Sequence, residues 1–145
     1  MSIKNLVDQS QRTLYAMYHK IRNINIPIDL QFRMFDCMIV PILLYASEIW
    51  GYEKTDVVEK VHLQFLKKSL NVRSTTPNYM VYGETGRFPL QIIIKTKLLC
   101  YWSRILQSGT EKLSGLLFQF ILRLQESRSY TFKWLDFLKK ILDDT

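Results

Sequence analysis

Glycine, proline and cysteine are scarce in this sequence. Its 145 residues include five glycines, four prolines and two cysteines. So few breakers leave long uninterrupted segments, which favours helices over many short strands. Cys37 and Cys100 each lie in an apolar stretch, so we expect two reduced, buried thiols rather than a disulfide or a metal site. The first residues lack the apolar core of a signal peptide, and we expect an intracellular protein, nuclear or cytoplasmic, that is not secreted.

A long hydrophobic run is also missing. The most apolar segment, residues 37–46, is interrupted by Pro41, and it is shorter than the roughly 20 residues that cross a membrane. We therefore expect no membrane partner. Because this segment is apolar on every side, we predict that it lies at the centre of the core. Pro41 lacks an N–H and predicts either a kink or two abutting helices.

Acidic residues are nearly absent from the middle of the chain. Between Lys60 and Arg104 there are eight basic residues and one acid, Glu84, in a protein of net charge +7. This concentration indicates a polyanionic partner, of which nucleic acid is the commonest. The alternative is a mildly basic protein whose charge serves no partner.

Apolar residues recur at helical spacing along most of the chain. The pattern predicts helices over residues 3–24, from about 28 into the apolar segment, 55–70, a short one after Pro77, 89–107, from 113, and from 131. The fold class is therefore all-α, with about six to seven helices in a bundle-like array around a kinked apolar central helix. In the helix from 113, one stripe contains Leu113, Leu116, Leu117, Phe120, Ile121 and Leu124. The last two helices are expected to pack in the core or to dock another protein.

Basic side chains share helix faces with polar and aromatic ones. In the helix 55–70, Lys60, Gln64 and Lys67 form one polar stripe with Lys68 beside it. In the helix 89–107, Lys97, Tyr101 and Arg104 share one face. A face of cations and an aromatic ring suits a nucleic-acid backbone with a base or sugar packed on the ring. A solvated face with snorkelling lysines gives the same pattern. The candidate nucleic-acid-binding residues are Lys60, Lys67, Lys68, Arg73, Lys97, Tyr101 and Arg104.

Glu59 and His62 fall within the apolar arc of the helix 55–70, three residues apart. The spacing E-x-x-H occurs in carboxylate-bridged di-metal sites, but these need two copies and further glutamates. The only other histidine is His19, and no second E-x-x-H exists. We therefore expect no metal and no cofactor, and favour a Glu–His hydrogen bond in the core or a contact of His62 with a partner. The sequence shows no catalytic constellation, so we expect no catalytic residues.

Four motifs follow one another through the middle of the chain. They are PILLYASEIWG (41–51), EKVHLQFLKKSLNV (59–72), TPNYMVYGETGRFPL (76–90) and IKTKLLCYW (94–102). In this order they resemble the region downstream of the palm in LINE-type (non-LTR) retrotransposon reverse transcriptases, and the resemblance covers about residues 1–106. The family usually has glycine at the position of Ala46. An alanine costs little if that position is helical.

The resemblance implies a helical thumb over residues 1–107, followed by a C-terminal helical hairpin over 108–145 that packs on it. In that family the thumb region grips template and primer. Catalysis belongs to a palm with a [YF]-A-D-D motif that binds two Mg²⁺ ions, whereas the only Asp-Asp here is Asp143-Asp144, next to the C-terminus. The resemblance therefore implies that the chain is a non-catalytic fragment of an RNA-directed DNA polymerase.

Such a fragment would bind RNA or an RNA–DNA duplex without sequence specificity, and other reverse transcriptase segments would be its protein partners. The alternative is a helical protein–protein interaction module, or a remnant of a transposable element without function.

Overall fold

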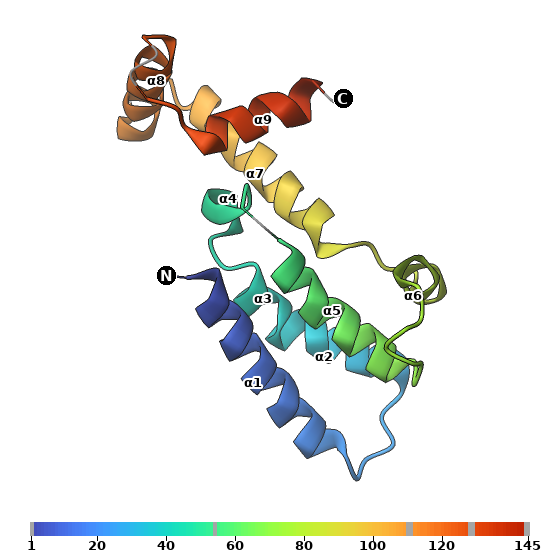
Figure 1. Ribbon diagram of the computed structural model, residues 1–145. Coiled ribbons are helices and arrows are strands. Elements are labelled where there is room, and N and C mark those ends of the chain that lie inside the picture. Colours follow the sequence, from blue (N-terminus) through green and yellow to red (C-terminus); the bar gives the residue numbers. More distant parts are fainter. Residues whose placement is uncertain (1, 54, 110–111, 128–129, 144–145) are drawn as a thin grey trace. The chain divides into compact units, whose positions relative to one another are not determined.

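The computed structural model describes residues 2–53, 55–109, 112–127 and 130–143, with Glu126 described in its main chain only. Every regular element in this part is a helix, and no strand occurs there (Figure 1). The expected all-α fold is thereby confirmed. The described residues form nine helices, more than the six to seven expected, and two of the nine have only four residues. Asp144 lies outside the described residues.

The chain forms two compact units. Unit 1 consists of residues 1–46 and 54–93, and unit 2 of residues 47–53 and 94–145. The sequence predicted one boundary, after residue 107, whereas the structure divides the chain after residues 46, 53 and 93. Within the described residues, no helix has the length and apolar character that crossing a bilayer requires.

Unit 1 is built from five helices and the first turn of a sixth. They are α1 (Ile3–Ile21), α2 (Ile28–Met38), α3 (Val40–Leu43), α5 (Asp56–Ser69), α6 (Asn78–Thr85) and the start of α7 (Leu90–Gln107). Ser2 caps the N-terminus of α1: its Oγ accepts a hydrogen bond from the Lys4 main-chain N–H at 3.3 Å. α1 packs against α3 and α5, and α5 packs against α6.

The core of unit 1 centres on two stacked aromatic rings. Phe35 of α2 and Phe65 of α5 are fully buried, with ring centroids 4.1 Å apart. Leu14 and Met17 of α1 are also fully buried. Each such side chain contributes about 1.5–3 kcal/mol when it leaves water, so the apolar stripe of α1 and the buried face of α5 stabilise unit 1.

The apolar segment around Pro41 is divided, as predicted. α2 ends at Met38 and α3 begins at Val40, with Pro41 in its first turn. The two helices abut because Pro41 has no N–H to donate to a carbonyl of the preceding turn. The prediction that the segment is buried on all sides is wrong: Ile39 is fully buried, but Met38 and Tyr45 are 43% and 60% exposed. A helix packed on one side only buries one stripe, whatever the composition of the other face.

The expectation of buried cysteines is also wrong. Cys37 and Cys100 are exposed thiols, not buried ones. Residues four apart lie on the same face of a helix, and the residue four positions from each cysteine, Pro41 or Thr96, is exposed. Both cysteines therefore lie on exposed helix faces, although their neighbours in sequence are apolar. Ala46 is not helical either, since its φ is +52°.

Unit 2 combines a short helix with three longer ones. They are α4 (Ser47–Trp50), the larger part of α7, α8 (Leu113–Glu126) and α9 (Lys133–Asp143). Its buried cluster consists of Leu98, Phe118, Leu135 and Leu138. The indole N–H of Trp134 in α9 donates to the carbonyl oxygen of Glu48 in α4 at 3.2 Å. A Cβ on Gly51 would collide with the Ile94 side chain and the Ser47 carbonyl, so glycine is required after α4.

The face of α8 that was predicted to be apolar is largely uncovered. Leu113, Leu116, Leu117 and Phe120 are 71%, 49%, 51% and 58% exposed. Phe118, between them in sequence, is the buried side chain of this helix. Unit 2 therefore carries an exposed apolar surface, which we call the α8 face and define by these four exposed residues.

Candidate nucleic-acid interface

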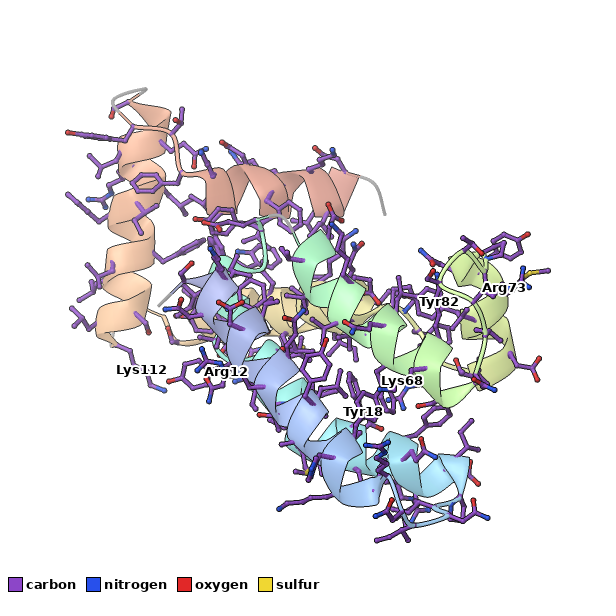
Figure 2. The ribbon with its side chains drawn as sticks, turned by 60° about the horizontal axis from the view of Figure 1, so that its bottom comes forward. Arg12, Tyr18, Lys68, Arg73, Tyr82 and Lys112 are labelled. Carbon is purple, nitrogen blue, oxygen red and sulfur yellow. The ribbon has the colours of Figure 1, made fainter. Side chains whose placement is uncertain are left out.

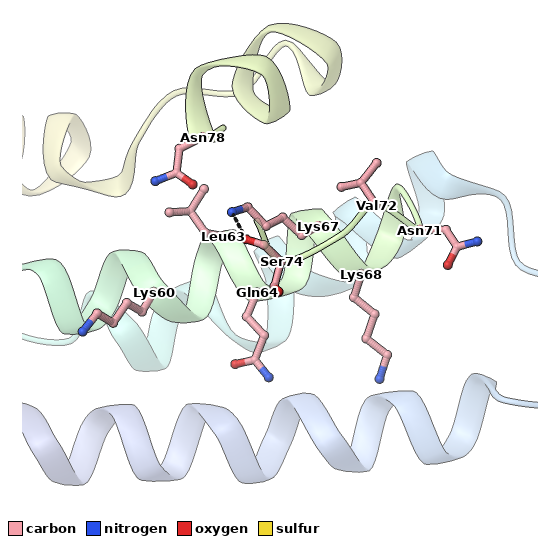
Figure 3. Close-up of a pocket in the computed structure, with 9 residues that line it drawn as sticks. All are labelled: Lys60, Leu63, Gln64, Lys67, Lys68, Asn71, Val72, Ser74 and Asn78. Carbon is pink, nitrogen blue, oxygen red and sulfur yellow. Dashed lines mark hydrogen bonds between the residues drawn. The ribbon is translucent and has the colours of Figure 1, made fainter. Parts of the chain in front are cut away.

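An open groove runs along α5 in unit 1. It has a volume of about 560 Å³, within the range of small-molecule sites in proteins. The groove is lined by Lys60, Leu63, Gln64, Lys67, Lys68, Asn71, Val72, Ser74 and Asn78 (Figure 3). These residues come from α5, from the loop after it and from the first position of α6. No aspartate or glutamate among the described residues lines this groove, which we call the lysine groove.

The spacing of α5 places its polar residues along the lysine groove. Lys60, Gln64 and Lys68 follow at intervals of four, so their side chains lie above one another on one face. From Lys60 to Lys68 the helix rises about 12 Å. Lys67 points to the other side of the groove, where its ammonium group donates a hydrogen bond to the Ser74 carbonyl oxygen at 2.8 Å (Figure 3). That bond ties the loop after α5 to the helix.

Two tyrosines of α1 contact the lysine groove. The Gln64 side-chain amide donates to the Tyr15 hydroxyl at 3.4 Å. The Lys68 ammonium lies 3.6 Å from the centroid of the Tyr18 ring (Figure 2), a cation–π contact. Burial raises the pKa of the Tyr18 hydroxyl above its usual value, and the neighbouring Tyr15 adds to this. Tyr18 is therefore neutral at physiological pH, and it holds the Lys68 head group at the edge of the groove.

The seven predicted nucleic-acid-binding residues divide between the two units. Lys60, Lys67 and Lys68 line the lysine groove together. Arg73 is exposed in the loop after α5, between two residues that line the groove, but its own side chain is not part of the lining.

The other three predicted residues, Lys97, Tyr101 and Arg104, lie on α7 in unit 2 and are exposed. They share one face of that helix, as the spacing predicts. The Tyr101 ring makes an edge contact with Trp134, with centroids 6.4 Å apart.

Several groove residues were not singled out from the sequence. Asn71, Ser74 and Asn78 follow α5 in the chain and complete the groove with two amides and a hydroxyl-bearing residue. A positive φ of 54° at Asn71 reverses the chain at the end of α5. Asparagine tolerates that conformation better than most residues, and this is the one sequence signal that could have found the turn. Tyr15 and Tyr18, three residues apart in α1, gave no signal because their neighbours on α5 are distant in sequence.

Glu59 and His62 form the core hydrogen bond that the sequence favoured. Their contact joins His62 Nδ1 to a carboxylate oxygen of Glu59 at 3.0 Å, and both residues are buried. The Tyr82 hydroxyl donates to the same oxygen at 2.5 Å, and the Gln91 main-chain N–H donates to the other at 3.3 Å. One carboxylate therefore links α5 to α6 and to the start of α7.

Burial alone raises the pKa of a carboxyl group. The hydrogen bonds that Glu59 accepts from His62 and Tyr82 outweigh this effect and hold the pKa of Glu59 below its usual 4.5. For Tyr82, burial and the bond to Glu59 both raise the pKa. In the described part of the chain, no group of three or more His, Cys, Asp or Glu residues has the arrangement of a metal site. The hydrogen bonds of Glu59 with His62, Tyr82 and Gln91 instead serve to join α5, α6 and the start of α7.

Comparisons of this chain with protein-family models, with curated proteins and with solved structures gave no match in any of the three.

Proposed function

We propose that this chain is a non-catalytic helical module that binds the sugar–phosphate backbone of RNA or of an RNA–DNA duplex. The observation that carries the proposal is the lysine groove, where three lysines and three side-chain amides gather without an acid among the described lining residues. Ammonium groups neutralise phosphates, while amides donate hydrogen bonds to phosphate and sugar oxygens. These contacts carry little sequence information, so binding is expected to be non-specific.

The ordered motifs point to the source of such a module. We propose that it corresponds to the thumb region of a LINE-type retrotransposon reverse transcriptase, with polymerisation performed by a palm outside this chain. Ala46 supports the resemblance: the family usually has glycine there, and the φ of +52° is in the region that favours glycine. Alone, the chain would not polymerise DNA, and other reverse transcriptase segments would be its protein partners.

The test is to measure, by fluorescence anisotropy, how binding to a labelled RNA–DNA duplex depends on salt concentration. If the six basic candidate residues each neutralise one phosphate, log K falls with log salt at a slope of about −4 to −5. Replacing Lys60 and Lys68 by glutamate removes two of these contacts and should flatten the slope by about 1.5 to 2.

A matched control makes the same charge change elsewhere. Lys139 and Lys140 are exposed on α9 in unit 2, and their replacement by glutamate should leave most of the slope intact. No binding at low salt, or a flat salt response of the unmodified chain, would contradict the proposal.

A second candidate function rests on the α8 face. An exposed stripe of three leucines and a phenylalanine on one helix is typical of helices that dock into a partner's groove. On this alternative the chain is a helical protein–protein interaction module. Replacing Leu116 and Phe120 by aspartate would then abolish partner cross-linking in cells, whereas replacing Lys67 and Lys97 by glutamate would leave it intact. The opposite pattern would argue for nucleic-acid binding.

A further inference from the structure

Tyr15 and Tyr18 of α1 contact the lysine groove, but they differ in what remains accessible. Tyr18 is partly buried and the Lys68 ammonium covers its ring at 3.6 Å. Its hydroxyl is a buried atom without a hydrogen-bond partner among the described residues. Tyr15 keeps 56% of its surface exposed. Of these two tyrosines, Tyr15 is the more exposed.

The position of the Tyr15 ring is tied to the groove lining. Its hydroxyl accepts a hydrogen bond from Gln64, the residue midway between Lys60 and Lys68 on the same face of α5. The exposed Tyr15 side chain therefore lies beside the face of α5 that carries Lys60 and Lys68. Cations that track a backbone beside a ring are the combination that single-strand binding proteins use.

We propose that the lysine groove takes an unpaired strand of nucleic acid, with the Tyr15 ring stacking on one base. This inference rests on the proposed function and narrows it. The lysines would hold phosphates, which paired and unpaired strands both present. The ring requires a base with a free face, and in a duplex both faces of a base are covered by its neighbours. Tyr15 therefore favours the unpaired strand.

The experiment compares four labelled probes by fluorescence anisotropy at one salt concentration: a 12-nucleotide oligouridylate, a 12-nucleotide oligothymidylate, an abasic strand of the same length, and a 12-base-pair RNA–DNA duplex. Replacing Tyr15 by leucine removes the ring but keeps an apolar side chain. We expect this change to weaken binding to the oligouridylate and the oligothymidylate about 5- to 150-fold, the range for loss of one stacked base. Binding to the abasic strand and to the duplex should change less than about twofold, because neither presents a base to the ring.

Two further variants serve as controls. Tyr15→Phe keeps the ring without the hydroxyl, and it should retain most of the binding that Tyr15→Leu loses. Tyr130 is similarly exposed, at 64%, but belongs to unit 2. Tyr130→Leu should leave binding to all four probes unchanged. Circular dichroism spectra identical to those of the unmodified chain would verify that each variant is folded.

The possible results separate the two proposals. If the unmodified chain binds none of the probes at low salt, the proposed function fails and this inference fails with it. If the chain binds but Tyr15→Leu has no effect on the oligouridylate, or weakens the abasic strand equally, the inference alone is overturned. A loss confined to the strands with bases supports stacking on Tyr15.

Discussion

Ala46 holds a backbone conformation that its own side chain disfavours. Its φ of +52° brings the Cβ close to the following carbonyl oxygen, which costs an L-residue about 1–2 kcal/mol. The residue lies in the turn between α3 and α4, where the chain passes from unit 1 to unit 2. Glycine avoids this cost, although it loses part of the gain to its greater freedom in the unfolded chain.

We predict that Ala46→Gly raises the free energy of unfolding by about 0.5–1 kcal/mol. Urea denaturation followed by circular dichroism measures the change. Ala16 provides the matched control because it is exposed within α1. There the same substitution should lower stability by about 1 kcal/mol. A loss of stability at both positions would contradict the assignment of strain to Ala46.

The Glu59 carboxylate makes the stability of unit 1 dependent on pH. Its pKa in the folded chain lies below the usual 4.5, so the hydrogen bonds that it accepts stabilise the folded state fully at pH values above about 4.5. This contribution decreases as the pH falls through the folded-state pKa, where the carboxylate becomes protonated. Acid should therefore loosen the link from α5 to α6 and α7.

We predict that Glu59→Gln lowers stability at pH 7 and flattens its dependence on pH between about 5 and 3. Urea denaturation at a series of pH values provides the measurement. Glu84→Gln is the control, since it removes an exposed carboxylate from the same unit. Equal pH dependence in the unmodified chain and in Glu59→Gln would refute a stabilising role for this carboxylate.

At the level of single residues, the sequence predicted what local spacing determines. The Glu59–His62 contact follows from a spacing of three within one helix. The predicted stripe of Lys60, Gln64 and Lys67, with Lys68 beside it, also rests on local spacing, and these four residues line one groove. Tyr15 of α1 contacts Gln64, and Asn78 of α6 lines the same groove. Both placements depend on how helices pack. A single sequence carries no direct signal for it.

At the level of elements, α8 shows two phenylalanines in opposite environments. Phe118 is 8% exposed and packs in the cluster of unit 2, whereas Phe120 is 58% exposed. Periodicity alone marked α8 as amphipathic, and it favoured the stripe that includes Phe120. It failed because a helix with leucines on much of its circumference offers more than one face that could be buried. The division of the apolar segment into α2 and α3 was predictable because proline breaks the hydrogen bonding of the helix in which it lies.

We predict that Phe118→Ala destabilises the protein by about 3 kcal/mol, because it leaves a cavity in the cluster of unit 2. Phe120→Ala should change stability by no more than about 0.5 kcal/mol. Thermal or urea unfolding of the two variants side by side is a direct comparison, since both remove the same side chain from one helix. Equal costs would show that the α8 face is covered in solution.

At the level of the whole molecule, basic candidate residues occur in both units. Of the six basic candidates, four belong to unit 1 and two, Lys97 and Arg104, belong to unit 2. If both sets hold one strand, the second contact is made at a high effective concentration, which strengthens binding to long strands only. A strand too short to reach both sets would depend on the lysine groove alone.

We predict that Lys97→Glu with Arg104→Glu weakens binding to a 20-nucleotide strand but not to a 5-nucleotide strand. Lys60→Glu with Lys68→Glu should weaken binding to both. Competition of the two strands against a labelled probe measures the effect. If the substitutions at Lys97 and Arg104 weakened binding to the short and the long strand equally, the short strand would not depend on the lysine groove alone.

Unit 1 is interrupted in sequence by residues 47–53, which belong to unit 2. During synthesis α4 therefore emerges before residues 54–93 of unit 1, and its own core forms only after residues 94–145 have been made. Until then Ile94, which lies against Gly51, has not been made. Nascent chains long enough for residue 93 to have left the ribosome should already protect α1 from protease while α4 is still cleaved, so the interleaving of the two units in the sequence sets the order of assembly.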